Sequence, residues 1–389
     1  MVKVNPRFSL SQLEEYKVET VPDADIIVNA NETNWALGKS LVAKVKAEID
    51  NFAFNRYPPM HAESMCQALA EGMRVDADKI IMGNGSSELL EKACYAFGGQ
   101  GKKIAFPYPS FSMYETYAQM ADSIPVPYPL NEEGFVDAQT VIDLCAQEKP
   151  ALLIICNPNN PTGNYNPLEV MEEILRNVDC PIIMDEAYME FVDADDKYST
   201  LSTLSLIGVY DNFLCLRTFS KAYGLAGMRV GYGTGSAELI SVMQKVLLPY
   251  HVNNLSLLVA EMAYREPELL RSRVASVIRG RKKVIAALAN MGFKIFPCAT
   301  NFVMFQPTEE QAAAYVKYAM EAGYTLDGNN KQMMGAMIFS KLLGAKILVR
   351  NFTKHPALPG AIRLSIGTEE ENTKIIETLQ AICDEAKEG

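Results

Sequence analysis

The sequence lacks any long apolar segment. No run among its 389 residues approaches the ~18 consecutive apolar residues that a membrane-spanning helix requires. The N-terminal stretch also has no apolar segment followed by a small-residue cleavage site, which a secretory signal would show. We therefore expect a cytoplasmic protein that neither crosses a membrane nor is exported through one.

Histidine is scarce, and cysteine is never clustered. The three histidines, His61, His251 and His355, lie far apart, and no H-E-x-x-H motif is present. The eight cysteines are scattered singly, without a C-x-x-C pair. A zinc site needs several such ligands at short spacing, and a disulfide framework belongs to oxidising compartments. We expect no metal site, and we expect reduced cysteines.

Positive charge is in the minority. The chain carries 36 Lys and Arg residues against 47 Asp and Glu residues, which gives a net charge of −11. An acidic molecule repels phosphate backbones and anionic lipid, so nucleic acid and membrane surfaces are poor partners. Any anionic ligand must therefore be held by a local cluster of cationic groups.

Short apolar runs alternate with helix-like stretches between residues 79 and 235. This alternation predicts an α/β fold with a doubly wound, mostly parallel seven-stranded sheet. The expected strands cover residues 79–82, 102–106, 124–128, 151–156, 181–184, 213–217 and 229–233.

The pattern changes beyond this region. A long helical region at 238–291 is followed by short strands and helices, which suggest a smaller α+β domain. We expect a large cofactor-binding domain at 50–290 and a small domain formed by 1–49 and 291–389. The segment 325–343 is rich in Met and Gly and leads to no structural expectation.

Three successive apolar runs end in reactive or polar side chains. The first leads into Asn157, the second into Asp185 and the third into Lys221. Ligands of open parallel sheets bind beyond the carboxyl ends of the strands, so these groups would converge on one crevice. They suit a carbonyl cofactor held as an imine on Lys221, with Asp185 keeping a pyridine nitrogen protonated. Asn157 and the nearby Tyr188 could hydrogen-bond the ring's phenolate oxygen, and Lys221 could move the substrate proton.

The segment 83–88, GNGSSE, follows an expected strand and opens an expected helix. Such a turn presents free backbone amides and hydroxyls at the positive end of a helix dipole, which suits a cofactor phosphate. Phe111 is placed to stack on a planar ring. Three residues near the lysine could complete the phosphate site: Thr218, Ser220 and Arg229.

Each of these residues also has an ordinary structural interpretation. A single lysine after a strand is more often a solvated side chain, and Asp185 alone could cap a helix or pair with an arginine. Ser86 and Ser87 could belong to an ordinary helix start, and Phe111 could lie in the core. The occurrence of reactive groups at successive strand ends favours the joint interpretation.

Four longer motifs make a family resemblance specific. They are CNPNNPTG at 156–163, DEAYMEF at 185–191, RTFSKAYGLAGMRVGY at 217–232 and AIRLSIGT at 361–368. The chain resembles the fold-type I, pyridoxal-phosphate-dependent aminotransferases of class I/II. Shorter elements narrow the resemblance to the histidinol-phosphate aminotransferase branch: NANE at 29–32, RYP at 56–58, GNGSSE at 83–88 and ILVRNF at 347–352.

The resemblance implies a role for each matching residue. Lys221 would form the imine, and Asp185 would pair with the pyridine nitrogen of pyridoxal 5'-phosphate. Asn157 and Tyr188 would contact its phenolate oxygen. The remaining cofactor contacts would come from Gly85, Ser86, Ser87, Phe111, Thr218, Ser220 and Arg229.

The resemblance also implies a homodimer and a substrate side. A tyrosine of the second subunit reaches the cofactor phosphate in this family, and Tyr57 stands in the matching RYP motif. Arg363 would hold the substrate carboxylate or its equivalent, for which a planar guanidinium is suited. Arg350 would bind a substrate phosphate. Asn157, and Tyr16 of the N-terminal arm, would also face the substrate.

Several positions depart from the family pattern. Ser87 stands where the family usually has Asp, Phe111 where it has Tyr, and Asn351 where it commonly has Pro. The arm near Tyr16 lacks the Pro-Gly that usually follows its tyrosine, and the stretch before Ile347 is longer. The core cofactor machinery is therefore intact, whereas the groups that read the substrate are altered.

These observations lead to a functional hypothesis. We expect a dimeric aminotransferase in which an amino donor leaves its nitrogen on the cofactor and a 2-oxo acid collects it. Histidinol phosphate with 2-oxoglutarate is the first substrate pair to consider, and aromatic amino acids are the second. A decarboxylase of the threonine-phosphate type on the same fold is the alternative. A DNA-binding regulator and a dinucleotide-dependent dehydrogenase are disfavoured, because the basic helix pair and the G-x-G-x-x-G turn that they need are not found.

Overall fold

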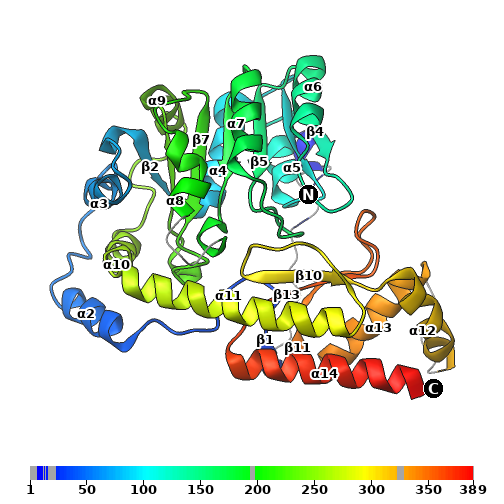
Figure 1. Cartoon of the computed structure of the whole chain (residues 1–389). Coiled ribbons are helices and arrows are strands. Elements are labelled where there is room, and N and C mark those ends of the chain that lie inside the picture. Colours follow the sequence, from blue (N-terminus) through cyan, green and yellow to red (C-terminus); the bar gives the residue numbers. More distant parts are fainter. Residues whose placement is uncertain are drawn as a thin grey trace, which may run out of the picture.

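The computed structural model describes residues 7–11, 13, 15, 23–192, 198–321 and 328–388. Tyr16, which we expected to face the substrate, lies outside the described residues. The chain forms a seven-stranded sheet, a four-stranded sheet and a two-stranded pair (Figure 1). Among the described residues, no helix is long and apolar enough to span a membrane.

The seven-stranded sheet confirms the predicted α/β fold. Its strand order is β2-β8-β7-β6-β5-β3-β4. Neighbouring strands pair in parallel, except that β8 runs antiparallel to both β2 and β7. The strands are β2 (Ile80–Gly83), β3 (Lys103–Tyr108), β4 (Ile124–Pro129), β5 (Leu152–Cys156), β6 (Ile182–Asp185), β7 (Phe213–Thr218) and β8 (Gly231–Gly235).

Helices cover this sheet on both faces (Figure 1). Some helix starts are capped by their own sequence: the Asp137 side chain accepts a hydrogen bond from the Thr140 amide at the start of α6, which satisfies an otherwise unpaired donor. The helices up to residue 264 are α1 (Phe8–Ser11), α2 (Lys39–Ile49), α3 (Glu63–Met73), α4 (Gly85–Phe97), α5 (Met113–Met120), α6 (Ala138–Glu148), α7 (Leu168–Asn177), α8 (Tyr198–Leu201), α9 (Ala237–Gln244) and α10 (Asn254–Tyr264).

The central strands are buried on both faces, which explains their unbroken apolar sequences. All five residues of β5 are buried, and successive side chains point to opposite faces of the sheet. Ile154 lies in one apolar core with Leu90 of α4. Ile155 lies in the other core with Ile174 of α7.

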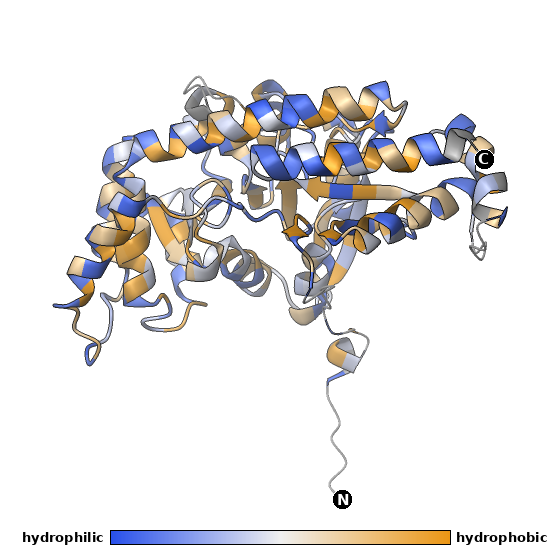
Figure 2. Ribbon diagram, turned by 90° about the horizontal axis from the view of Figure 1, so that it is seen from below, coloured by the Kyte–Doolittle hydropathy of each residue, from blue (hydrophilic) through white to orange (hydrophobic). Residues whose placement is uncertain are grey.

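The four-stranded sheet is antiparallel, in the order β12-β13-β10-β9. Two long helices, α11 (Pro267–Asn290) and α14 (Glu369–Glu388), lie side by side next to it (Figures 1 and 2). Figure 2 shows polar and apolar residues alternating along both helices, as expected for helices with one buried stripe. The other elements are β9 (Lys294–Ile295), β10 (Phe302–Gln306), α12 (Glu309–Glu321), β12 (Arg350–Phe352) and β13 (Ala361–Ser365).

Two elements complete this part of the molecule. β1 (Ile26–Ile27) pairs in parallel with β11 (Ile347–Leu348), which ties an early segment to a late one. α13 (Asn330–Gly344) occupies most of the segment 325–343. It begins with a capping box in which Asn329 and Gln332 bond each other's backbone amides, a device that stabilises helix starts.

The division into domains at 49/50 and 290/291 stays a prediction. Core contacts cross both boundaries. Leu41 of α2 lies in one core with Val259 of α10, and Val284 of α11 lies in another with Phe302 of β10. Helices α2 and α11 therefore connect the two expected parts.

A buried ion network fixes the chain just after β6. Arg217 of β7, whose side chain is 1% exposed, forms ion pairs of 2.9 Å with Glu186 and with Glu190. The hydroxyls of Ser202 and Thr203 donate hydrogen bonds to Glu186. Because Glu186 directly follows the last residue of β6, the network holds that strand end in place.

Replacing Arg217 with methionine should destabilise the fold strongly. Glu186 and Glu190 would stay buried without their counter-charge, which costs about 3–5 kcal/mol in comparable cases. We expect the R217M variant to lose free energy of unfolding on that scale in a urea titration. The exposed pair between Arg176 and Glu172 supplies the control, because R176M should barely move the urea midpoint. An R217M protein as stable as the wild type would show that the network is not structural.

Candidate active site

A cavity of about 380 Å³ lies beyond the carboxyl ends of β5, β6 and β7. Strand β12 and strand β13 of the smaller sheet close its other side. The size falls in the range of small-molecule sites, and the position is the one where open parallel sheets bind ligands. Of the residues predicted for the site, the cavity is lined by Ser86, Ser87, Phe111, Asp185, Tyr188, Thr218, Ser220, Lys221, Arg229, Arg350 and Arg363.

Asp185 ends β6 and is buried at the base of this arrangement. The Tyr114 hydroxyl donates to its Oδ2 at 2.7 Å, and the Ala187 amide donates to its Oδ1 at 3.2 Å. Burial raises the pKa of Asp185 to about 6, while these two hydrogen bonds act in the opposite direction. The carboxylate therefore remains ionised at neutral pH, although its pKa lies only slightly below neutral pH.

Lys221 lies three residues beyond β7, and its Nζ donates to the Ala30 carbonyl oxygen at 3.0 Å. Burial, together with the positive charges of Arg363 and Arg229 and against the opposing effect of Glu32, lowers the pKa of Lys221 to about 8. A lysine with such a pKa has a sizeable fraction of free amine near neutral pH, which is the form that attacks carbonyl groups.

Tyr188 is held by the segment that precedes α2. Asn31 donates from its Nδ2 to the Tyr188 hydroxyl oxygen at 3.0 Å. Burial raises the pKa of Tyr188 to about 12, against the lowering effects of Arg363 and of the Asn31 hydrogen bond. The Asn31 amide also donates to Ser365 Oγ at 2.9 Å, so one residue connects the tyrosine to strand β13.

Asn157 does not take the place predicted for it. Its Nδ2 donates to the Asn166 carbonyl at 2.9 Å, and its Oδ1 accepts from the Asn166 amide at 2.8 Å. Both ends of the Asn157 amide are thus used to fold the loop. Among the described residues that line the cavity, the asparagine of this loop is Asn160, which accepts a hydrogen bond from Arg363. The structure therefore places Asn160 at the cavity, whereas the side chain of Asn157 is used within the loop.

The start of α4 forms a cradle with Arg229. Gly85 has a φ of 74°, and a Cβ added to it would lie 2.9 Å from Arg229 Nη2. A Cβ added to Gly231 would lie 2.3 Å from the Ser86 amide nitrogen. Both glycines keep the helix amides open and close to the guanidinium, an arrangement that suits an anion such as phosphate. On the other side, the Thr218 hydroxyl donates to Ser220 Oγ at 3.0 Å.

The smaller sheet contributes two arginines to the cavity, and they differ in whether their side chains already have bonding partners. Arg350 and Arg363 are register partners on neighbouring strands. The Arg363 guanidinium lies over the rings of Phe302 and Phe352, at 5.1 and 5.6 Å from their centroids, and donates to the Asn29 carbonyl at 2.9 Å. Among the described residues, none forms a hydrogen bond or ion pair with the side chain of Arg350, whose backbone belongs to the β12–β13 ladder. Arg363 is therefore fixed, whereas Arg350 keeps its donors for a ligand.

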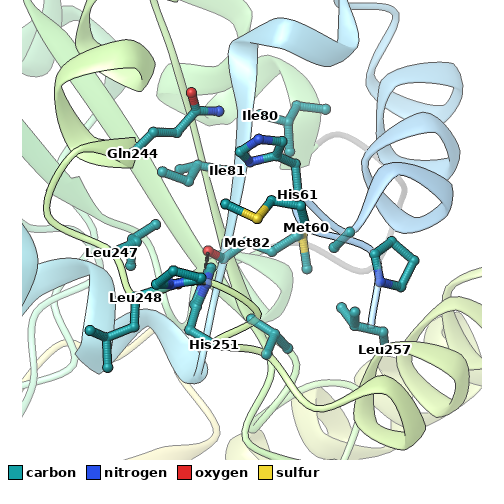
Figure 3. Close-up of a pocket in the computed structure, with 14 residues that line it drawn as sticks. Met60, His61, Ile80, Ile81, Met82, Gln244, Leu247, Leu248, His251 and Leu257 are labelled. Atoms are coloured by element: carbon teal, nitrogen blue, oxygen red, sulfur yellow. Dashed lines mark hydrogen bonds between the residues drawn. The ribbon is translucent and has the colours of Figure 1, made fainter. Parts of the chain in front are cut away.

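Tyr57 lies outside the cavity within the single chain. It is 80% exposed and stacks on Tyr250, with ring centroids 4.7 Å apart. The chain segments next to these tyrosines form a second pocket of about 70 Å³, and Met60, His61 and Leu248 are among the residues that line it (Figure 3). None of the predicted site residues lines this pocket.

Several cavity residues were missed by the sequence analysis. Tyr114 and Asn31 form hydrogen bonds with Asp185 and Tyr188, which lie 71 and 157 positions away in the sequence. His355 lines the cavity and stacks on Tyr108 of β3, with centroids 5.6 Å apart. No local signal marks any of these three. Asn160 could have been found, because it directly precedes the Pro-Thr-Gly turn of its motif.

The sequence profile of the aminotransferase class I and II family matches residues 26–379. The matched range contains the larger sheet, the smaller sheet and every described lining residue of the cavity. The chain belongs to the class I and II aminotransferases. This confirms the predicted family and fold, the transaminase activity and the pyridoxal phosphate cofactor of that family.

This aminotransferase is similar to named relatives over nearly its whole length. A histidinol-phosphate aminotransferase of Thermoanaerobacter sp. (strain X514) is 30% identical over 383 residues, which is 98% of this chain and 99% of the relative. The solved histidinol-phosphate aminotransferase of Sinorhizobium meliloti, in complex with pyridoxal-5'-phosphate, matches with a TM-score of 0.83 at 19% identity over 99% of both chains.

A decarboxylase shares the same fold. The solved L-threonine-O-3-phosphate decarboxylase of Porphyromonas gingivalis matches with a TM-score of 0.72 at 21% identity, over 92% of this aminotransferase and 99% of that chain. A likeness at this level of identity shows the common fold alone, so it does not decide between the two reactions.

The lowered pKa of Lys221 leads to a test on the cofactor-free aminotransferase. Because burial and the nearby arginines disfavour the ammonium form, Lys221 should react with a small anhydride half-maximally near pH 8. Peptide mass spectrometry as a function of pH measures this, with the exposed Lys282 as internal reference. The R363Q variant should move the Lys221 profile to higher pH, since it removes a positive charge. Lys221 and Lys282 reacting with identical pH profiles would contradict the prediction.

Proposed function

We propose that this aminotransferase transfers the amino group of histidinol phosphate to 2-oxoglutarate by a ping-pong route. The observation that carries the proposal is the pair of arginines at one cavity wall. Arg363 is fixed and Arg350 keeps its donors, which gives the acidic chain two local anion sites opposite Lys221. The name of the Thermoanaerobacter relative, a histidinol-phosphate aminotransferase, supports the same substrate.

The cavity fits pyridoxal phosphate. Its phosphate would lie at the start of α4, bound by the amides of Ser86 and Ser87, the Ser220 hydroxyl and Arg229, with Gly85 and Thr218 shaping the cradle. Bound there, the cofactor supplies an electron-withdrawing ring that stabilises negative charge at the substrate carbon. The residues present match its groups: an anion cradle, a buried carboxylate and a free amine.

The chain's own groups divide the work around that ring. Lys221 would bind the cofactor covalently and then move a proton at the substrate carbon. Asp185 would hold the ring nitrogen, Phe111 would stack on the ring, and Tyr188 with Asn160 would bind its phenolate oxygen. These contacts orient the cofactor, and burial of the site excludes water from the reacting atoms.

The substrate side favours a donor with an anionic group. Arg350 would bind the phosphate of histidinol phosphate, and Arg363 would hold the carboxylate of 2-oxoglutarate or glutamate, since a guanidinium matches both anions. Phe111, Phe352 and His355 give the cavity an aromatic lining, which also favours an aromatic amino acid as a second candidate donor.

A spectroscopic half-reaction screen tests the substrate. The yellow, cofactor-loaded enzyme should be converted fastest by histidinol phosphate, and 2-oxoglutarate should restore its spectrum. The R350Q variant should lose roughly 10- to 100-fold in kcat/KM for histidinol phosphate, the scale of a hydrogen bond to a charged group. Histidinol, which lacks the phosphate, is the matched control substrate and should be much less affected.

The other outcomes of this screen are equally informative. Equal losses for histidinol phosphate and histidinol in R350Q would refute the phosphate role of Arg350. Fastest conversion by an aromatic amino acid would replace the proposed donor, and release of carbon dioxide with an amine product would replace transfer by decarboxylation. K221A serves as the control for cofactor attachment, because borohydride should no longer fix the cofactor to that variant.

We also propose a cytoplasmic homodimer in which Tyr57 reaches the partner's cofactor phosphate. Several exposed apolar side chains lie close in sequence to Tyr57 and Tyr250, and two of them, Met60 and Leu248, line the pocket drawn in Figure 3. A buried interface explains why such side chains lie on the surface of one chain. They are Phe54, Tyr57, Met60, Leu248 and Tyr250. The eight free cysteines support a reducing compartment.

Subunit mixing tests the contribution of Tyr57 from the partner. In a mixed dimer of K221A and Y57A, one site would combine the intact Lys221 with the intact Tyr57. We expect random mixing to restore tight cofactor binding in about a quarter of all sites, measured at a cofactor concentration too low to saturate Y57A. If Tyr57 served its own subunit, no site in the mixture would be complete, and tight binding would not return.

A further inference from the structure

Tyr114 is a buried phenol that the proposed transfer reaction does not yet use. It lies on α5, its side chain is fully buried, and it lines the cavity. Its hydroxyl donates to Asp185 Oδ2 at 2.7 Å, and its ring meets Phe111 edge-on, with centroids 5.5 Å apart. Burying a hydroxyl group at such a position destabilises the folded protein unless the hydroxyl forms a hydrogen bond.

The surroundings of Asp185 show how much depends on this contact. The Ala187 amide is a longer donor to the other carboxylate oxygen, at 3.2 Å. Among the described residues, no other side chain donates a hydrogen bond to Asp185. Burial and the charge of Glu186 both oppose ionisation of the carboxyl group. The other titratable groups near the pair are Cys156 of β5, Tyr117 of α5 and Tyr188.

These neighbours remain uncharged at neutral pH. Burial raises the pKa of Cys156 to about 12 and those of Tyr117 and Tyr188 to about 12 as well. The pKa of Tyr114 is raised well above its usual range, first by burial and then by the charge of Asp185. Tyr114 therefore keeps its proton and acts as a permanent donor.

We propose that Tyr114 is a positioning residue that keeps Asp185 ionised and aimed at the ring nitrogen of the cofactor. The inference rests on the proposed pairing of Asp185 with that nitrogen. One proton is shared between the two groups, and it can lie on the nitrogen or on the carboxylate. A hydrogen bond donated to the carboxylate stabilises its charged form, so Tyr114 biases the proton toward the nitrogen.

This bias matters because of where the electrons go. A protonated ring nitrogen withdraws electrons from the substrate carbon, and a neutral one withdraws them less. Without the phenol, Asp185 would lie in the same buried place with only the Ala187 amide as donor, and the shared proton would move toward its carboxyl group. Tyr114 would thus act on the reaction through Asp185, without touching the reacting atoms.

The direct test follows the shared proton in the loaded enzyme. With the cofactor labelled by ¹⁵N in its ring, the Y114F variant should show a nitrogen resonance displaced toward the unprotonated value. The rate constant of the half-reaction should fall about tenfold. This corresponds to a change of one unit in the pKa difference between the ring nitrogen and the Asp185 carboxyl group. KM for the donor should stay within about twofold, because substrate contacts are untouched. An unchanged nitrogen resonance in Y114F would overturn the proposal.

Two further variants separate the possible failures. Tyr128 of β4 is also fully buried, and its hydroxyl donates to the Ile154 carbonyl at 3.0 Å, so Y128F controls for the loss of a buried phenol and should leave the resonance unchanged. D185N removes the ionisable partner itself. If D185N leaves the nitrogen resonance unchanged, the proposed pairing of Asp185 fails. If D185N moves it and Y114F does not, only the inference about Tyr114 fails.

A second measurement covers the case in which Y114F does not fold. Incorporation of 3-fluorotyrosine at position 114 keeps the shape of the side chain and places a fluorine nucleus beside the hydrogen bond. Its ¹⁹F resonance should differ between the otherwise wild-type enzyme and D185N, because the carboxylate partner is lost. Identical fluorine resonances in the two proteins would show that Tyr114 does not sense Asp185 and would overturn the proposal.

Discussion

The register of the parallel pairing between β5, β6 and β7 is the constraint on which the site depends. Cys156 pairs with Asp185, and Asp185 pairs with Leu216. Successive residues of a strand point to opposite faces, so Asp185 points to the cavity while Glu186 points to the buried ion network around Arg217. A shift of one residue would exchange these two directions. The network that stabilises the fold is therefore also what keeps the carboxylate on the catalytic side.

A short segment from early in the chain joins the two sheets at the cavity. Asn29 accepts from Arg363 of β13, Ala30 accepts from Lys221, and Asn31 donates to Tyr188. Three consecutive residues thus contact the arginine proposed to bind an anion, the amine of Lys221 and the phenol of Tyr188. Because the contacts to Asn29 and Ala30 use backbone carbonyl oxygens, they depend on the path of the segment more than on its side chains. The parallel pairing of β1 with β11 fixes that path.

The larger sheet and its strand-end residues were predictable from the sequence, because a buried parallel strand is an unbroken apolar run and its carboxyl end is where that run stops. Asp185 and Lys221 were found in this way. Asn157 was misplaced because the loop after β5 turns back on itself through Asn166, and apolar periodicity carries no information about loops. Tyr114 could not be identified from the sequence, because the hydrogen bond that links it to the site is made with a carboxylate 71 residues away. Helix α13 was missed because Met and Gly give a weak amphipathic pattern.

Burial shifts the pKa values of the two ionisable groups of the site in opposite directions and brings both closer to neutral pH. It raises the pKa of Asp185 to about 6 and lowers that of Lys221 to about 8. A change of one pKa unit corresponds to about 1.4 kcal/mol, so at neutral pH each group is close to exchanging a proton. Arg363 and Arg229 lower the pKa of Lys221 through their charge, and anions bound to them would offset that charge and favour the ammonium form. The arginines proposed to bind anions therefore also contribute to the protonation state of the lysine, which would couple binding of the substrate to its chemistry.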